Sequence, residues 1–169
     1  VYARIAASVP GARFWFIEES SAAVTATLEQ RLGRAFAAEG LDAAQHCQFH
    51  PRLSQQEFFG LASSADVILD SILWSGNNSS MEGSACGRPI VTLPGAMMRG
   101  RHSYAICQQM GIDATIATDL DHYIEIAVRL GTDPSFYAER VAAVKQHRER
   151  LYDDPVPIKA FEEFLLENA

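Results

Sequence analysis

Residues 66–95 constrain the fold of this chain most strongly. Two apolar runs, residues 67–69 and 90–93, flank the polar run 75–80 and a short segment of small residues. Apolar strands joined by a short helix predict a βαβ unit with parallel strands. Ligands of an open α/β sheet bind beyond the carboxyl ends of its strands, so the polar run is the expected binding edge.

This polar run has the features of a phosphate-binding loop that works without a metal. A helix that begins near Ser79 offers unpaired backbone N–H groups and the positive end of its dipole. Gly76 lets the backbone approach a ligand closely, and Asn77 and Asn78 add neutral donors. Glu82 lies one turn further on, where its carboxylate can accept hydrogen bonds from ribose hydroxyls. We expect a nucleoside diphosphate here, with its phosphates at the helix tip.

A structural interpretation of the same residues stands beside this one. Ser79 and Glu82 have the spacing of a capping box, in which the two side chains only satisfy the first turn of the helix. Such boxes are common, and the motif alone favours capping over ligand binding. The two roles are compatible with each other.

Composition narrows the class of protein. A chain of 169 residues with 48% apolar and 21% charged residues is long enough for one domain, residues 1–169, with a sizeable core. The net charge of −7 argues against a nucleic acid as partner, although one bound nucleotide needs only a local site. The chain lacks the run of about 18 apolar residues expected of a membrane span. Three cysteines without a CxxC pair indicate a reducing, cytoplasmic compartment.

Strands alternate with helices along the whole chain. Helices are expected at residues 2–9, 22–39, 55–65, 79–86, 103–110, 119–130, 135–151 and 158–168, and strands at 13–17, 46–50, 67–69, 90–93 and 114–117. Val24, Leu28, Leu32 and Phe36 form the predicted buried stripe of the second helix. Ser54 should cap the third. This order predicts an α/β fold: a Rossmann-like, doubly wound parallel sheet of about five strands with helices on both faces.

Basic and aromatic residues lie near the same edge. Arg99, Arg101 and His102 follow a predicted strand and are candidates for contact with phosphate or with an acceptor. A solvated loop is an equally good interpretation. Trp15 and Trp74 are most simply core or pocket-wall residues, and Trp74 adjoins the polar run.

Two patterns suggest metal ligands only superficially. Asp119 and Asp121 form a DxD, but they stand just before a helix, where capping is the better interpretation. His46 and His50 flank a predicted strand, and zinc would need further ligands, which favours a structural role. We therefore expect no metal and no other cofactor.

A set of collinear positions between residues 49 and 133 carries a family resemblance. The positions are Phe49, Pro51, Ala65, Asp66, Val67, Leu69, Asp70, Gly76, Met81, Glu82, Gly87, Pro89, Val91, Thr92, Pro94, Gly95, Ile126, Ala127, Val128, Leu130, Gly131, Thr132 and Asp133. Here the chain resembles the C-terminal half of the catalytic region of glycosyltransferase family 41. That family includes protein O-GlcNAc transferases, plant SPINDLY proteins and bacterial glycosyltransferases with tetratricopeptide repeats.

The resemblance implies the C-terminal, nucleotide-binding half of a GT-B fold. It implies an inverting, metal-independent transfer of GlcNAc or another hexose from a UDP-sugar to Ser or Thr of a protein. The catalytic residues are expected in an N-terminal half that this chain lacks, together with possible tetratricopeptide repeats, so the fragment alone should be inactive. Residues 155–169 are expected to form a helix that packs back on that missing half.

The resemblance also implies roles for single positions. Asn77, Asn78 and Ser79 stand where the animal enzymes place His-Thr-Thr around the donor phosphates, and Glu82 stands where they place an Asp on the ribose. Leu53 stands where backbone groups read the base. Gln55 replaces a Lys near the nucleotide, which leaves less positive charge at the phosphates. A UDP-sugar is the leading donor, and a GDP-sugar is the alternative.

Three functions follow from these observations. The first is the donor-binding half of a protein glycosyltransferase. The second is a GT-B enzyme that acts on a small-molecule or glycan acceptor, including an epimerase-like enzyme. The third is a non-catalytic interaction domain that has kept the fold. Nucleotide binding distinguishes the first two from the third.

Overall fold

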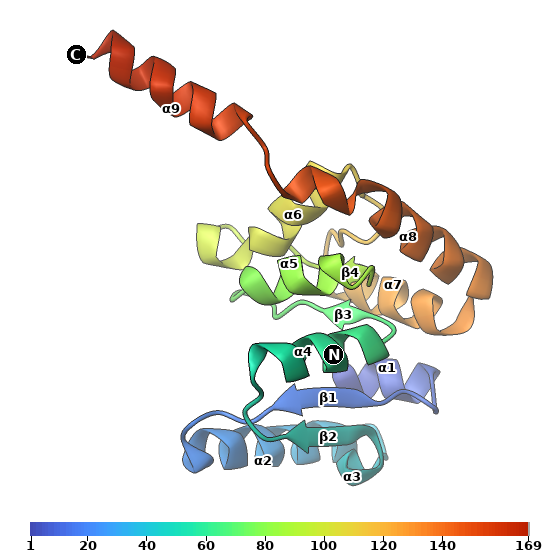
Figure 1. The fold of residues 1–169 in the computed structure, drawn as a ribbon. Helices are drawn as coiled ribbons and strands as arrows, with labels where there is room; N and C mark the ends of the chain where they lie inside the picture. Colours follow the sequence, from blue (N-terminus) through green and yellow to red (C-terminus); the bar gives the residue numbers. More distant parts are fainter. Residues whose placement is uncertain (169) are drawn as a thin grey trace.

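The computed structural model describes residues 1–168, in which short parallel strands alternate with helices (Figure 1). In chain order the helices and strands are α1 (Tyr2–Ser8), β1 (Phe14–Ile17), α2 (Ala22–Ala38), α3 (Ala43–His46), β2 (Cys47–His50), α4 (Gln55–Ser64), β3 (Ile68–Leu69), α5 (Asn78–Ala85), β4 (Ile90–Val91), the 3-10 turn η1 (Met98–Gly100), α6 (His102–Met110), α7 (Leu120–Thr132), α8 (Pro134–His147), the 3-10 turn η2 (Arg148–Leu151) and α9 (Val156–Glu167).

The strands form two parallel two-stranded sheets and not the single larger sheet that the alternation predicts. β1 pairs with β2 from Phe14↔Cys47 to Ile17↔His50, and β3 pairs with β4 at Ile68↔Ile90 and Leu69↔Val91. The predicted strand at 114–117 is reduced to one bridge, Thr92↔Ile116. Pro89 and Pro94 lack the N–H that a ladder needs, and they delimit the short β4 pairing. Figure 1 shows α2 along the first sheet and α5 and α7 beside the second.

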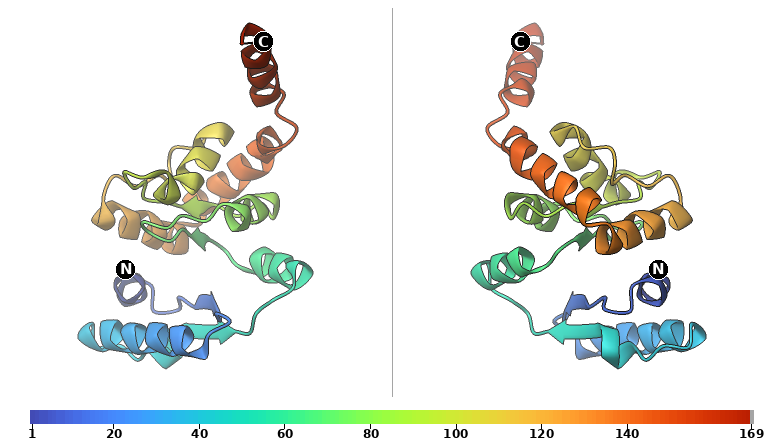
Figure 2. Two further views of the ribbon diagram at one scale, coloured as in Figure 1. Left: turned by 90° about the vertical axis from the view of Figure 1, so that its left-hand side faces the viewer. Right: turned by 90° about the vertical axis from the view of Figure 1, so that its right-hand side faces the viewer.

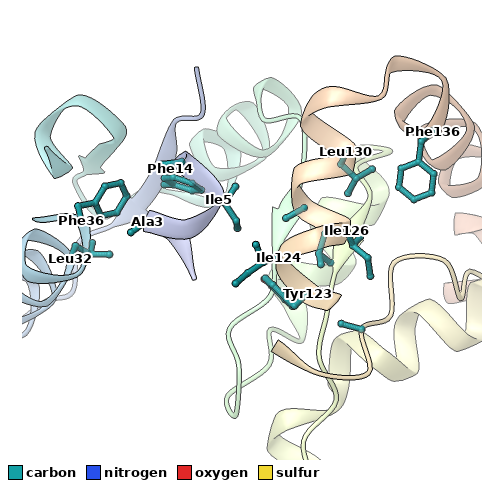
Figure 3. Close-up of a cluster of buried hydrophobic side chains, with 14 residues drawn as sticks. Ala3, Ile5, Phe14, Leu32, Phe36, Tyr123, Ile124, Ile126, Leu130 and Phe136 are labelled. Carbon is teal, nitrogen blue, oxygen red and sulfur yellow. The ribbon is translucent and has the colours of Figure 1, made fainter. Parts of the chain in front are cut away.

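One apolar cluster connects the two sheets (Figure 3). On one side Phe14 of β1 packs with Phe36 of α2, with ring centroids 6.2 Å apart. On the other side Ile124 of α7 belongs to the same cluster, and Ile5 of α1 lies between these groups in Figure 3. A second cluster places Ile90 of β4 among buried residues of α6 and α8. Burial of these side chains holds both sheets in one α/β body.

Helix termini follow the sequence signals closely. Ser54 and Glu57 form a complete capping box at α4, as predicted. Asp119 caps α7 and Asp133 caps α8, each by accepting a hydrogen bond from a backbone N–H of the first turn. Gly111 ends α6 in the left-handed conformation, with φ of 72°. These local devices fix where the connecting loops begin.

Several expectations about the elements are wrong in detail. Val24 is 53% exposed and does not belong to the buried face of α2. The fully buried residues of this helix are Leu32 and Phe36. α3 precedes β2, where a strand from His46 was expected. The helix expected over 135–151 changes to a 3-10 turn at Arg148. The local pattern does not mark these changes because tertiary packing decides them.

Helix α9 extends away from the rest of the molecule (Figures 1 and 2). Its side chains are exposed and include the large apolar residues Val156, Ile158, Phe161, Phe164, Leu165 and Leu166. The predicted helix at 158–168 is thus confirmed, with an earlier start. Within residues 1–168, none of the helices combines the length and the apolar character needed to cross a membrane.

Candidate functional site

Two cavities lie on either side of the first turns of α5. The first has a volume of about 470 Å³ and is lined by Ile17, Glu18, Glu19, Arg52, Leu53, Ser54, Gln55, Phe58 and Glu82. The second has a volume of about 540 Å³ and is lined by Ser71, Trp74, Ser75, Gly76, Asn77, Asn78, Ser79, Arg99 and His102. Every predicted site residue except Arg101 lines one of the two.

The first cavity brings together Leu53, Gln55 and Glu82 from two helices, as predicted. Gln55 Nε2 donates a hydrogen bond of 3.3 Å to Glu82 Oε1, which joins the start of α4 to the first turns of α5. The capping box fixes the start of α4, because the Ser54 N–H and hydroxyl donate to Glu57 Oε2 at 2.8 and 2.7 Å. These hydrogen bonds from Ser54 lower the pKa of Glu57.

Asp70 holds the loop that leads into α5. Its carboxylate is only 6% exposed. Oδ2 accepts hydrogen bonds from the Ser75 hydroxyl at 2.8 Å and the Thr92 hydroxyl at 2.7 Å, and Oδ1 accepts from the Gly76 N–H at 2.8 Å. The Asp70 carbonyl accepts a hydrogen bond of 3.0 Å from Tyr123 of α7. A charged acceptor at the end of β3 thus fixes the backbone of the polar run.

Ser103 joins the beginnings of α5 and α6. Its N–H donates to Ser75 Oγ at 2.8 Å, and its hydroxyl donates to the Gly76 carbonyl at 3.1 Å. The hydroxyls of Ser80 and Ser103 are 2.8 Å apart, and both side chains are fully buried. Asn78 begins α5 and His102 begins α6, so this network places the first residues of two helices at the second cavity.

Gly76 has a different role from the predicted close approach to a ligand. Its N–H is used by Asp70, and a Cβ at this position would lie 2.6 Å from Ser80 Oγ and 2.7 Å from Ser79 Oγ. Glycine is therefore required here by the close approach of the first turn of α5.

The predicted capping box at Ser79 and Glu82 is wrong. α5 begins at Asn78 with Asn77 as its N-cap, and Glu82 bonds to Gln55 instead. Among residues 1–168, the Asn77 side chain makes no capping hydrogen bond to this helix. The N–H groups of the first turn thus face the second cavity without a side-chain cap.

The basic residues divide into two groups. Arg99 and His102 line the second cavity, and the Arg99 guanidinium lies 5.8 Å from the ring centroid of Trp74. Arg101 turns away: its Nη1 donates to the Gly95 carbonyl at 2.7 Å, and its guanidinium lies 4.8 Å from the ring of Tyr104. Arg101 thus supports the loop and does not line either cavity.

The superficial metal patterns have structural roles. Asp119 Oδ1 accepts a hydrogen bond of 2.8 Å from the His122 N–H, and Asp121 pairs with Arg4 at 2.8 Å. His46 Nδ1 lies 2.9 Å from the Ala12 carbonyl. In the part of the chain that the structure describes, no three His, Cys, Asp or Glu side chains come together as metal ligands. The expectation that the chemistry uses no metal stays a prediction.

Sequence reasoning missed the residues that hold the site together. Asp70, Ser75 and Ser103 form buried hydrogen bonds that hold the loop before α5. Ser75 and Ser103 are 28 positions apart in the chain. One signal was available: Asp70 ends an apolar run and stands just before the polar run.

Comparison with known proteins agrees with this geometry. The sequence model of glycosyl transferase family 41 matches residues 1–154, so the chain belongs to that family. A UDP-N-acetylglucosamine–peptide N-acetylglucosaminyltransferase of Caenorhabditis elegans is 29% identical over 116 residues, which are 69% of this chain and 10% of the relative. A mutant O-GlcNAc transferase of Thermobaculum terrenum matches the structure with a TM-score of 0.80 and 24% identity, over 99% of this chain.

These matches confirm the predicted fold class, the Rossmann-like α/β fold of a GT-B catalytic region. The chain spans 32% of the Thermobaculum protein and 10% of the Caenorhabditis protein. The activity of the whole protein is therefore taken up as a proposal.

Proposed function

We propose that residues 1–169 form the donor-binding domain of an inverting, metal-independent glycosyltransferase. The donor is a UDP-sugar, and GlcNAc or another hexose passes to Ser or Thr of a protein. Membership of family 41 supports the reaction class. The printed name of the Caenorhabditis relative, a peptide N-acetylglucosaminyltransferase that uses UDP-N-acetylglucosamine, supports the donor and the acceptor.

One observation carries this proposal: residues of the first turns of α5 line two cavities with different chemistry, Glu82 the first and Asn78 and Ser79 the second. The first has a half-buried carboxylate, Glu82, that can accept from two ribose hydroxyls, and Leu53 and Gln55 that can contact a base. The second has two helix N-termini and the cation Arg99. This succession of a polar sugar site and an anion site suits a nucleoside diphosphate.

The same arrangement explains how the domain would assist the reaction. Breaking the bond between the sugar and the diphosphate leaves negative charge on the departing phosphate. N–H groups of Asn78 and Ser79 stand at the helix tip before the reaction, so they stabilise this charge without reorganising. Arg99 adds a positive charge beside them. We place the groups that activate the acceptor hydroxyl in the other half of the enzyme.

Helix α9 supports a partner surface in the same proposal. Phe161, Phe164 and Leu165 are 50–62% exposed on one helix. Such side chains cost free energy in water, which favours packing against another folded surface. We propose that this surface is the first half of the same enzyme.

Calorimetric titration of the 169-residue chain with UDP, GDP and UDP-GlcNAc tests the proposed function. The proposal predicts that UDP binds and that Glu82→Ala weakens its binding by about 1–3 kcal/mol, the cost of leaving polar partners unpaired. Glu149→Ala, at an exposed acid outside both cavities, is the matched control and should bind like the wild type.

Other outcomes redirect or reject the assignment. A preference for GDP moves the donor to a GDP-sugar. Transfer to a small molecule or glycan, tested with a longer polypeptide that contains both halves, favours the second class of enzyme. Failure of that longer polypeptide to bind any nucleotide rejects the transferase and leaves a non-catalytic interaction domain.

A further inference from the structure

We propose that Tyr152 is a positioning residue for the donor, because it fixes the turn of α5 that presents Glu82 to the ribose. This inference rests on the proposed function, in which Glu82 binds the ribose hydroxyls. Tyr152 lies outside both cavities and is 71 positions away from Met81 in the chain. Its hydroxyl donates a hydrogen bond of 3.1 Å to the Met81 carbonyl. That carbonyl belongs to the planar peptide group that also contains the nitrogen of Glu82, so the hydrogen bond acts on the backbone of the ribose ligand.

The segment of residues 148–154 around this tyrosine is anchored by two arginines. The Arg148 guanidinium donates to the carbonyl of Ala85, the last residue of α5. Arg150 Nη1 donates at 3.2 Å to the carbonyl of Met110, the last residue of α6. A cation stabilises the negative end of a helix dipole, so both contacts are favourable. The 148–154 segment is therefore attached to the same two helices whose first residues lie at the second cavity.

Contacts with α6 fix the chain on both sides of Tyr152. Gln109 Nε2 donates to the Arg150 carbonyl at 3.4 Å and to Asp154 Oδ2 at 3.1 Å. Between these two points Asp153 adopts the left-handed conformation, with φ of 53°, and the chain continues to α9 (Figure 1). The position of the Tyr152 hydroxyl is thus set by the fold of the whole segment.

This arrangement holds Glu82 from two directions. Gln55 Nε2 donates to its carboxylate at 3.3 Å, and Tyr152 fixes the peptide group that precedes its Cα. Burial raises the pKa of the Tyr152 hydroxyl, and the negative charges of Glu149 and Glu82 raise it further. The hydroxyl therefore stays protonated at neutral pH and remains a donor. Since a carboxylate binds hydroxyls only within a narrow range of distance and angle, a shifted backbone weakens its contact with the ribose.

Two nucleotides that differ only at the ribose test this inference. UDP carries both hydroxyls from which Glu82 would accept, and 2′,3′-dideoxy-UDP lacks them. In calorimetric titrations of the 169-residue chain, Tyr152→Phe should lower the affinity for UDP by about 2- to 10-fold, as expected for the loss of one hydrogen bond. The affinity for 2′,3′-dideoxy-UDP should stay as in the wild type. If this chain alone binds UDP too weakly for calorimetry, the same titrations use the longer polypeptide that contains both halves.

Tyr137→Phe is the matched control. It removes a hydroxyl that accepts a hydrogen bond of 3.3 Å from Arg88 Nη1, and Tyr137 lies on α8, outside both cavities. Its affinity ratio of UDP to 2′,3′-dideoxy-UDP should equal that of the wild type. Urea unfolding of Tyr137→Phe and Tyr152→Phe reports any general loss of stability separately from binding.

A double-variant cycle shows whether Tyr152 acts through Glu82. In the Glu82→Ala background, Tyr152→Phe should weaken UDP binding no further, because the carboxylate that Tyr152 positions is absent. Losses that simply add in the double variant would mean that Tyr152 acts on the nucleotide by another route.

The outcomes separate this inference from the proposed function. Suppose that UDP binding depends on Glu82, but that Tyr152→Phe either binds both nucleotides normally or weakens both equally. That result, or additive losses in the double variant, overturns the positioning role alone. Absence of UDP binding in the polypeptide with both halves overturns the proposed function and the positioning role with it. A lowered ratio that disappears without Glu82 supports both.

Discussion

Replacing Asp70 with alanine should destabilise the chain and loosen the beginning of α5. Asp70 is the shared acceptor for Ser75, Gly76 and Thr92, with donor–acceptor distances of 2.7–2.8 Å. Ser75 can turn to Ser103, whose hydroxyl oxygen lies 3.0 Å away. The Thr92 hydroxyl, which is fully buried, and the Gly76 N–H would lose their acceptor.

The magnitude follows from these two donors. A buried donor left without an acceptor costs about 1–3 kcal/mol, so the pair costs about 2–6 kcal/mol. Removing the carboxylate also removes its own desolvation cost, because Asp70 forms no ion pair within residues 1–168. We expect a net loss of about 2–4 kcal/mol for Asp70→Ala. Asp70→Asn keeps one acceptor oxygen for Gly76 and should cost about 1–2 kcal/mol.

Urea unfolding, with a common m-value for all variants, measures the loss. Amide hydrogen exchange of Gly76 reports separately whether the loop has opened. Asp66→Ala is the control, because Asp66 is an exposed acid close by in the sequence and should change stability by less than about 0.5 kcal/mol. An Asp70→Ala variant as stable as this control, with Gly76 still protected, would refute the described network.

Three further predictions concern other positions. Gly76→Ala should cost about 1–3 kcal/mol in urea unfolding and weaken UDP binding, because its Cβ would lie 2.6 Å from Ser80 Oγ; wild-type behaviour would contradict the close contact. Ser54→Ala should cost about 1 kcal/mol at pH 7 as an N-cap loss. The pKa of Glu57 is lowered from 4.5 in the folded chain, so the stability that the ionised Glu57 contributes is present above pH 4.5 and is lost as pH falls through the folded pKa. The difference in unfolding free energy between wild type and Ser54→Ala should therefore shrink in acid, and a difference that stays constant with pH would contradict this. Burial raises the pKa of the Cys107 thiol from 9.0 to about 12, which lowers its thiolate fraction at pH 8 by about 1,000-fold. Iodoacetamide at pH 8 should therefore modify Cys107 far more slowly in the folded than in the unfolded chain, and equal rates would contradict its burial.

Local sequence signals predicted much of this fold and some of the site. Ser54 and Asp119 cap the first turns of their helices, and Gly111 ends its helix, where capping preferences place them. Leu53, Gln55 and Glu82 meet in one cavity because each lies just after a strand of a βα unit, in or before the helix that follows, and α4 and α5 contact each other. These features depend on contacts within a few residues or on the general topology of α/β sheets.

The remaining features depend on contacts between distant segments. Asp70 finds Thr92 on the next strand, and Ser75 finds Ser103 on another helix, so no window of sequence contains the network. Glu82 bonds to Gln55 and not within the expected capping box, because the N-cap of α5 is Asn77, two residues before Ser79. Val24 fits the helical period, but no neighbouring side chain within the described residues buries it.

The position of bound UDP is the sharpest test of the proposed donor site. A crystal structure of the chain with UDP, or of a longer polypeptide that contains both halves, should show the uracil and ribose in the cavity of Gln55 and Glu82. It should show the phosphates at the tip of α5, beside Asn78 and Ser79. UDP bound elsewhere, or with its phosphates away from this helix tip, would contradict the account.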